Sequence, residues 1–234
     1  MRLRGRKGIK EELEAQKDLC LLEPQEYKGG WREFFGNDKP IHAELGMGKG
    51  RFISHMSKRN PDVNYIGVDM YDELVRRASV KARALWSEEE DMTPPNLALA
   101  RFNIETIEDI FAEGELERIY LNFSDPWPKA KHARRRLTHA NFVNKYKKVL
   151  NENGEIHFKT DSETLFEFSL NSFSEMRLQM KNISLNLHRE GVTEDMHVMT
   201  EYETKFTKQG MPIFRCEVLI GQAASEKYNR SLSE

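Results

Sequence analysis

Short apolar runs alternate with amphipathic helical stretches through most of this 234-residue chain, and this alternation constrains its fold more than any other feature. Five runs have the length and residue content of buried strands, at residues 41–45, 64–69, 96–102, 117–123 and 155–159. Segments with apolar residues at helical spacing separate them. Strands that alternate with helices predict an α/β fold with a mainly parallel, doubly wound, Rossmann-like sheet covered by helices on both faces.

Further patterns predict the remaining elements. Helical spacing predicts helices over residues 51–59, 71–86 and 139–150, the last closed by Asn153-Gly154. Thr160 and Glu163 have the spacing of a capping box, so a helix should run from there to about Met176. Two alternating runs, at residues 183–187 and 214–220, predict a terminal antiparallel pair of strands.

From the N-terminus to the C-terminus, composition predicts three parts: a basic arm and leader (1–38), a single domain (39–222) and a polar, disordered tail (223–234). No apolar run is long enough to span a membrane, and the basic start lacks the apolar segment of a secretory signal, so we expect a cytoplasmic protein. Cys20 and Cys216 are too far apart in sequence, and too isolated, to predict a zinc site or a disulfide framework.

A glycine-rich loop follows the first predicted strand, at Glu44-Leu45-Gly46-Met47-Gly48-Lys49-Gly50. Its G-x-G-x-G spacing differs from the dinucleotide fingerprint and from the P-loop, which disfavours NAD and excludes a P-loop ATPase. An acid before the loop and Asp69 at the end of the second strand suit a nucleoside with a free ribose and a cationic amino-acid part, which is S-adenosylmethionine. The alternatives are a simple strand-to-helix turn and a helix-capping Asp69.

The segment Asp125-Pro126-Trp127-Pro128-Lys129 ends the fourth predicted strand, and its prolines fix an extended loop that can aim Asp125 and Trp127 at a substrate. A dense run of cations follows it. The formal net charge is −2, but without the ten cations of residues 1–10 and 129–136 the remainder would carry −12. Such segregation predicts a local docking surface for a polyanion such as nucleic acid. A structural turn beside a solvated charged face is the alternative.

These residues resemble the bacterial tRNA (guanine-N7)-methyltransferase family. The similarity extends from Arg2-Leu3-Arg4 through the glycine loop, Gly67-Val68-Asp69, the DPWPK segment and Phe158-Lys159-Thr160-Asp161 to the segment 200–206. It implies a class I methyltransferase fold. It also implies methyl transfer from S-adenosylmethionine to N7 of a guanosine in the tRNA variable loop, at position 46 in tRNA numbering, by a monomer or homodimer without a bound metal.

The resemblance also assigns residues, position by position. The cofactor-binding positions are Glu44, Gly46, Gly48, Gly50, Asp69, Asn103 and Asp125. The substrate-binding positions are Lys129, Asp161, Thr204, Lys205, Phe206 and Thr207. The RNA-interacting positions are Lys131, His132, Arg134, Arg135 and Arg136. Asp125 is the catalytic candidate, through positioning and electrostatics. The loop from Glu88 to Pro95 is longer than the resemblance implies, so Asn96 is the alternative to Asn103.

Other functions remain compatible with these patterns. A non-catalytic tRNA-binding or scaffold protein could keep the same fold, and a methyltransferase could act on another nucleic acid or on protein. Individual residues also have structural alternatives, since Asp161 could favour a helix N-terminus, Lys205 could be a solvated helix residue and Phe206 could belong to the core.

Overall fold

The structure is a computed structural model that describes residues 7–87, 94–191 and 198–233. The described residues fall into two compact units, one ending at Ala112 and the other beginning at Glu113. Arg2, Arg4 and Arg6 of the basic arm, and the acidic loop from Glu88 to Asp91, lie outside the described residues. Within the described ranges, the helices are all too short or too polar to cross a membrane.

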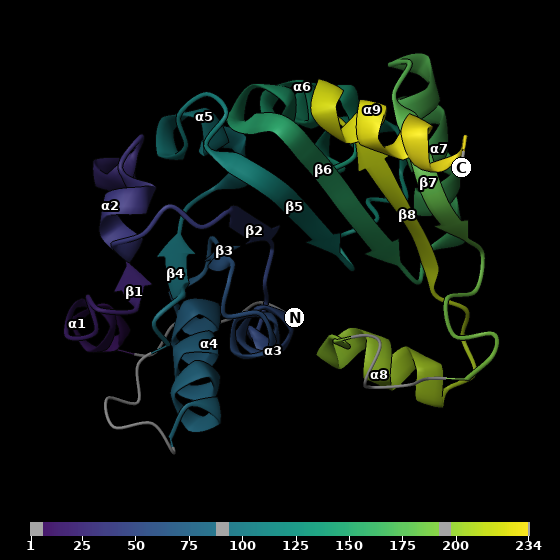
Figure 1. Ribbon diagram of the computed structural model, residues 1–234. Helices are drawn as coiled ribbons and strands as arrows, with labels where there is room; N and C mark the ends of the chain where they lie inside the picture. The colour runs from purple at the N-terminus through teal and green to yellow at the C-terminus, as the bar shows by residue number, and fades with distance from the viewer. Residues whose placement is uncertain (1–6, 88–93, 192–197, 234) are drawn as a thin grey trace. The chain divides into compact units, whose positions relative to one another are not determined.

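The described residues of unit 1 form four parallel strands in the order β1-β4-β3-β2 (Figure 1). Their bounds are Cys20–Leu21 (β1), Ile41–Leu45 (β2), Asn64–Asp69 (β3) and Leu97–Arg101 (β4). Every residue of β2 and β3 is buried. Strands of a parallel sheet are continuous apolar runs in the sequence because both of their faces are covered. For this reason they could be predicted from short apolar runs.

In the part of unit 1 that the structure describes, seven helices surround these strands. They are α1 (Ile9–Glu14), η1 (Pro24–Tyr27), α2 (Trp31–Phe35), α3 (Arg51–Arg59), α4 (Asp72–Leu85), η2 (Ile104–Thr106) and α5 (Ile107–Ile110). The leader packs into this unit. Trp31 is fully buried, and its indole Nε1 donates to the carbonyl of Ile110 at 3.0 Å. Leu13 and Leu19 are also fully buried.

Unit 2 contains β5 and β6 in parallel, followed by an antiparallel end, in the order β5-β6-β8-β7. The strands are Leu116–Asn122 (β5), Leu150–Thr160 (β6), Gln179–Ser184 (β7) and Phe214–Leu219 (β8). The helices are η3 (Ala130–Arg135), α6 (Ala140–Val149), α7 (Glu163–Glu175), α8 (Glu201–Lys208) and α9 (Gln222–Ser231). The prediction of an α/β fold with parallel strands and a terminal antiparallel pair is confirmed.

Helix α9 corrects the expectation of a disordered tail. Gln222–Ser231 is helical, packs beside β6 (Figure 1) and buries Ala224. Its start is held because the amides of Ile220 and Gly221 donate to the carbonyl of Gly154 at 2.9 and 3.0 Å. Apolar periodicity did not predict this helix because it has few apolar residues and, of these, only Ala224 is buried.

Two predicted helix ends also differ from the structure. Helix α7 is capped by Ser162, whose hydroxyl accepts from the amide of Leu165, whereas Thr160 accepts from the amide of Ser162. Asn153-Gly154 does not close α6, because β6 already begins at Leu150.

The two buried cysteines lie in different units, Cys20 on β1 and Cys216 on β8, and both are free thiols. Burial raises the pKa of each to about 12. They therefore behave as small apolar side chains rather than as nucleophiles.

Gly50 allows α3 and α4 to approach each other closely. It has φ +73°, and a Cβ built on it would lie 2.5 Å from the Cβ of Ala78 on α4. Gly46 has φ +83°, but a Cβ there would meet nothing within 4 Å. Both glycines have positive φ, but only Gly50 lacks room for a side chain.

We therefore predict that Gly50→Ala lowers the free energy of unfolding by about 1 to 3 kcal/mol more than Gly46→Ala does, because only the former overpacks a helix contact. Urea denaturation of the two variants and the parent measures the difference. Equal destabilisation would mean that backbone conformation alone accounts for the glycine at position 50.

Candidate cofactor and substrate sites

The glycine loop of unit 1 is pinned to the neighbouring strand. The amides of Gly46 and Met47 both donate to the carbonyl of Val68 on β3, at 2.9 and 2.8 Å. Gly46 and Gly48 have positive φ, and a Cβ on either would project into open space. The loop is a shallow cradle of backbone that side chains at these positions would fill.

Asp69 closes this cradle at the end of β3. Its Oδ2 accepts from the amide of Gly48 at 3.2 Å and its Oδ1 from the amide of Tyr71 at 3.1 Å. The residue is 8% exposed. Each carboxylate oxygen has further lone-pair capacity, so Asp69 can hold the loop and still accept from ligand hydroxyls. The N-cap of α4 is Tyr71, without a side-chain capping bond, so Asp69 does not cap that helix.

The structure separates the two candidate asparagines. Asn96 is buried, and its Nδ2 donates to the carbonyls of Ser57, Asn60 and Val63 at 2.8–3.2 Å. Asn103 is exposed and caps η2, with its Oδ1 accepting from the amide of Glu105.

Asn103 follows β4 at the same edge of the sheet as Asp69, because the amide of the preceding Phe102 donates to the Asp69 carbonyl at 3.1 Å. Glu44, buried on β2 opposite Gly67, belongs to the same set of adjacent strands. Unit 1 therefore brings together the predicted cofactor positions Glu44, Gly46, Gly48, Gly50, Asp69 and Asn103 at the carboxyl ends of three strands.

In unit 2, the DPWPK segment (Asp125–Lys129) follows β5. Phe123 and Trp127 both have positive φ, +53° and +42°, in residues with bulky side chains. The amide of Phe123 donates to the carbonyl of Lys159 on β6 at 2.9 Å. Asp125 and Lys129 are exposed. The segment thus holds its acid and its base at the surface on a backbone of unusual shape.

The basic segment Lys131–Arg136 includes most of the 3-10 helix η3 and divides into two kinds of side chain. Lys131 and Arg134 are exposed. Arg135 lies over the Trp127 ring at 4.8 Å, and His132 meets the edge of the same ring at 5.6 Å. Arg136 is half-buried and donates to backbone carbonyls of the DPWPK segment.

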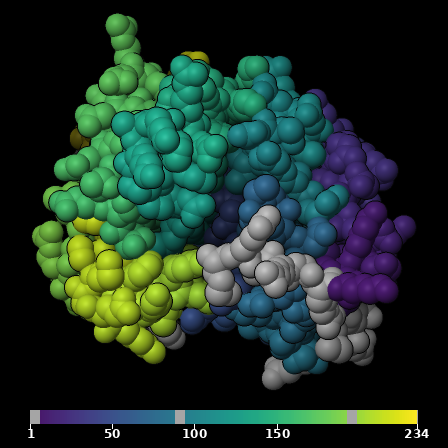
Figure 2. Space-filling view, turned by 180° about the vertical axis from the view of Figure 1, so that it is seen from behind, coloured from purple at the N-terminus to yellow at the C-terminus, as the bar shows by residue number. Residues whose placement is uncertain are grey.

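Helix α8 carries the last group of predicted residues, and its side chains lie on the face of unit 2 drawn in Figure 2. Thr204 donates to the carbonyl of Thr200 at 3.1 Å, and Lys205 is exposed with its Nζ 5.4 Å from the Phe206 ring. Phe206 packs against Tyr202 and Phe123, both at 6.1 Å between ring centres. Thr207 is half-buried. The ring of Phe206 therefore links α8 to the residue that begins the turn into the DPWPK segment.

Glu203 is a residue that sequence reasoning missed. It is fully buried, with Oε2 2.7 Å from Lys159 Nζ and Oε1 2.9 Å from His188 Nε2. Burial alone would raise the pKa of Glu203, but hydrogen bonding to His188 and the charge of Lys159 hold it at about 2. Thr200 and Glu203 form a capping box, and their T-x-x-E spacing was the available signal. Because Lys159 belongs to β6, this network ties α8 to the end of that strand, two residues before Asp161.

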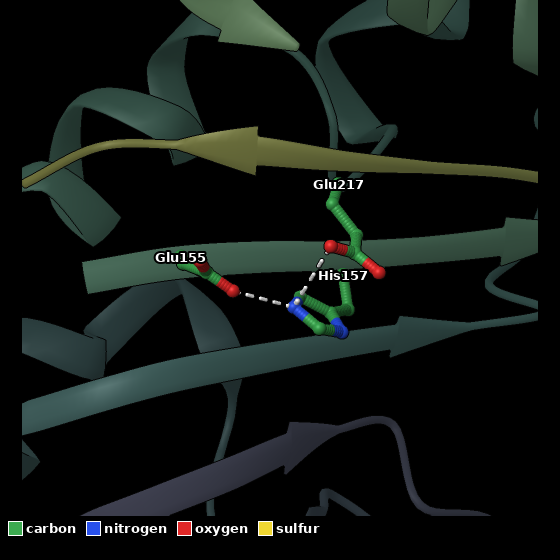
Figure 3. A group of neighbouring side chains, drawn as sticks. All are labelled: Glu155, His157 and Glu217. Carbon is green, nitrogen blue, oxygen red and sulfur yellow. Dashed lines mark hydrogen bonds and ion pairs between the residues drawn. The ribbon is translucent and has the colours of Figure 1, made fainter. Parts of the chain in front are cut away.

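A second buried network contains Glu155, His157 and Glu217, whose ligand-type atoms lie within 4.8 Å of one another (Figure 3). Lys181 Nζ lies 2.7 Å from Glu155 and 3.7 Å from Glu217, Arg118 lies 3.3 Å from Glu155, and Arg215 bonds Glu217. Three cationic side chains face two carboxylates, so a metal ion would meet a site already neutralised by protein. The group is a salt-bridge network between β5, β6, β7 and β8.

Comparison with known proteins gives a consistent match. A family model described as "Putative methyltransferase" matches residues 38–216. The chain is 49% identical to the tRNA (guanine-N(7)-)-methyltransferase of Geobacillus sp. (strain WCH70) over 93% of this chain and 95% of that protein. It is 45% identical to the protein of the same name from Bacillus subtilis (strain 168), over 93% of this chain and 98% of that one.

Solved structures are similar in fold. The 16S rRNA methyltransferase KamB superimposes with a TM-score of 0.59 at 11% identity, covering 81% of this chain and 91% of that chain. The 16S rRNA (adenine(1408)-N(1))-methyltransferase from Catenulisporales acidiphilia gives a TM-score of 0.57 at 15% identity, covering 85% and 93%. At these identities the likeness concerns the fold alone.

The buried carboxylates generate a prediction about acid stability. The folded-state pKa is lowered to about 2 for Glu155 and Glu203, where burial opposes the shift and hydrogen bonds and nearby cations drive it, against an ordinary value of 4.5. As pH falls from about 4.5 towards 2, the unfolded chain binds protons that the folded chain does not, so the free energy of unfolding should fall over that window. Urea denaturation at a series of pH values measures it.

Glu203→Gln should reduce this dependence and should also cost about 3 to 5 kcal/mol at neutral pH, since it breaks an ion pair whose carboxylate is fully buried and whose Lys159 side chain is only 12% exposed. Glu163→Gln, at an exposed position, is the matched control. Identical acid profiles for Glu203→Gln and the parent would show that Glu203 does not contribute to acid sensitivity.

Proposed function

We propose that this chain, which belongs to the tRNA (guanine-N(7)-)-methyltransferase family, transfers a methyl group from S-adenosylmethionine to N7 of a guanosine in the tRNA variable loop, at position 46 in tRNA numbering. The observation that carries the proposal is the match to relatives of that name over 93% of the chain at 45–49% identity. The residues that the family model matches, 38–216, include the glycine loop, the DPWPK segment and α8. A cytoplasmic location follows from such a substrate, and the state of assembly is proposed as monomer or homodimer.

The residues of unit 1 fit S-adenosylmethionine. The open space above Gly46 and Gly48 admits a ligand close to the backbone, and Asp69 offers a carboxylate to two ribose hydroxyls. Glu44, buried next to the loop, suits the ammonium of the methionine part, directly or through water. Asn103 offers an exposed amide for the adenine edge. When bound, the cofactor supplies an electrophilic methyl group on its sulfonium.

The chain's own contribution to the transfer is positioning. Guanine N7 carries an in-plane lone pair, so no proton has to be removed before attack, and the protein has no need of a strong base. Holding reacting groups in line can contribute on the order of 7 to 11 kcal/mol. We assign Asp125 to orienting the purine and to offsetting the positive charge that develops on it. Lys129, Asp161 and the 204–207 segment of α8 are the proposed partners of the guanosine and its neighbours.

Binding of tRNA is assigned to the exposed cations that follow the DPWPK segment. Lys131 and Arg134 point to solvent, and Arg135 is held over the Trp127 ring. Phosphate binding by lysine and arginine releases counterions and supplies most of the affinity that does not depend on sequence. The segment therefore supports recognition of the tRNA backbone rather than of particular bases.

Incubation of the protein with labelled S-adenosylmethionine and unmodified tRNA tests the proposed function. We expect N7-methylguanosine at one position of the variable loop. Asp125→Ala should lower the single-turnover rate by at least tenfold with the fold intact, and Asp125→Asn should retain more activity if hydrogen bonding matters more than charge. Cofactor binding without any methylated tRNA would favour a scaffold, and an unchanged rate for Asp125→Ala would make the DPWPK segment structural.

Asp69→Ala should weaken S-adenosylmethionine binding while leaving tRNA affinity nearly unchanged. The loss of charged hydrogen bonds should cost about 1.5 to 3 kcal/mol of binding free energy. Calorimetry with Asp62→Ala, an exposed acid before β3, as the control measures the effect. Unchanged cofactor affinity for Asp69→Ala would remove this residue from the site.

A further inference from the structure

We propose that Arg136 is a positioning residue that holds the DPWPK segment, and with it Asp125, in the shape needed for methyl transfer. This inference rests on the proposed function, but its geometric part concerns unit 2 alone. Arg136 lies at the end of the basic segment and was expected, with its neighbours, to contact RNA. Its contacts in the folded chain indicate a different task.

The DPWPK segment needs support from outside itself. Phe123 and Trp127 hold left-handed backbone conformations, with φ +53° and +42°, which are unfavourable for residues with a Cβ. Pro126 and Pro128 have no amide hydrogen to donate within the segment. A backbone of this kind persists where surrounding groups fix it.

Arg136 supplies such support through its guanidinium group. Its Nε donates to the carbonyl of Pro126 at 3.1 Å and one terminal nitrogen donates to the carbonyl of Trp127 at 3.0 Å. The two acceptors are consecutive carbonyls, and the second belongs to a residue with positive φ. The planar fork of arginine presents two donors in a fixed arrangement, and it clamps this turn directly after Asp125.

The guanidinium is itself held in place. It lies 4.3 Å from the centre of the Phe168 ring on α7. The backbone of Arg136 is fixed on both sides, because its amide donates to the carbonyl of Ala133 at 3.1 Å and its carbonyl accepts from the amide of His139 at 2.9 Å. The clamp is therefore anchored to η3, to the start of α6 and to α7.

Neighbouring cations provide the contrast that makes the inference testable. Arg134, two residues earlier, is exposed, whereas Arg136 is half-buried. A phosphate contact depends mainly on charge, so lysine can replace arginine there. A pair of hydrogen bonds to two carbonyls, combined with stacking on a ring, depends on the planar guanidinium group. Lysine cannot reproduce this arrangement. Lysine substitution at the two positions should have opposite results.

The experiment compares Arg136→Lys and Arg136→Ala with Arg134→Lys and Arg134→Ala in the full chain. Three quantities are measured: the single-turnover rate at saturating tRNA and S-adenosylmethionine, tRNA affinity across several salt concentrations, and amide hydrogen exchange in the peptide covering residues 122–130. We expect both Arg136 variants to lower the saturating rate at least tenfold, to leave the log-log salt slope unchanged and to speed exchange in that peptide. Arg134→Ala should lower the slope by about 0.7 to 0.9 and leave exchange in residues 122–130 unchanged, and Arg134→Lys should keep the slope of the parent.

A full saturating rate for Arg136→Lys, with a reduced slope for Arg136→Ala, would make Arg136 a phosphate contact and overturn the proposal. Unchanged exchange in residues 122–130 for both variants would overturn it as well. If the parent protein fails to methylate tRNA, the proposed function fails instead, and the exchange measurement still decides whether Arg136 holds the segment. If Arg136→Ala does not fold, Arg136→Lys carries the same comparisons.

Discussion

Strands that are buried on both faces present polar groups to a ligand mainly at their ends, and this constraint determines where most of the candidate residues on the strands and the loops after them lie in each unit. Asp69 ends β3, Asn103 follows β4, and the glycine loop follows β2. In unit 2, the DPWPK segment follows β5 and Asp161 follows β6. In α/β sheets ligands bind outside the carboxyl ends of the strands for this reason. The sequence of each strand therefore fixes where its chemistry can occur.

The parts that could be predicted are those with a strong local pattern. The expected bounds of β2, β3 and α3 agree with the structure because buried strands and amphipathic helices have clear periods. The glycine loop lies beside Asp69 because β2 and β3 are adjacent parallel strands. The proposed contacts of these residues with cofactor and tRNA stay predictions.

What could not be predicted depends on contacts between distant segments. Glu203 reads as a surface residue of a polar helix, but partners at positions 159 and 188 allow it to be buried as an anion. Arg136 is indistinguishable from Arg134 in a basic run until the carbonyls of Pro126 and Trp127 and the ring of Phe168 are located. Helix α9 likewise depends on its anchoring to Gly154. The sequence shows where charged side chains occur. Only the tertiary structure shows which of them bind other groups of the same protein.

The distribution of the two cysteines has a practical consequence for following the dynamics of this protein. One thiol lies on β1 in unit 1 and the other on β8 in unit 2, and both are buried with a pKa of about 12, chiefly because of burial. A maleimide or aromatic disulfide reagent reacts with a thiolate that it can reach, so modification requires local opening. Labelling followed by peptide mapping would report the opening rate of each unit separately, in the unaltered chain and without any engineered probe.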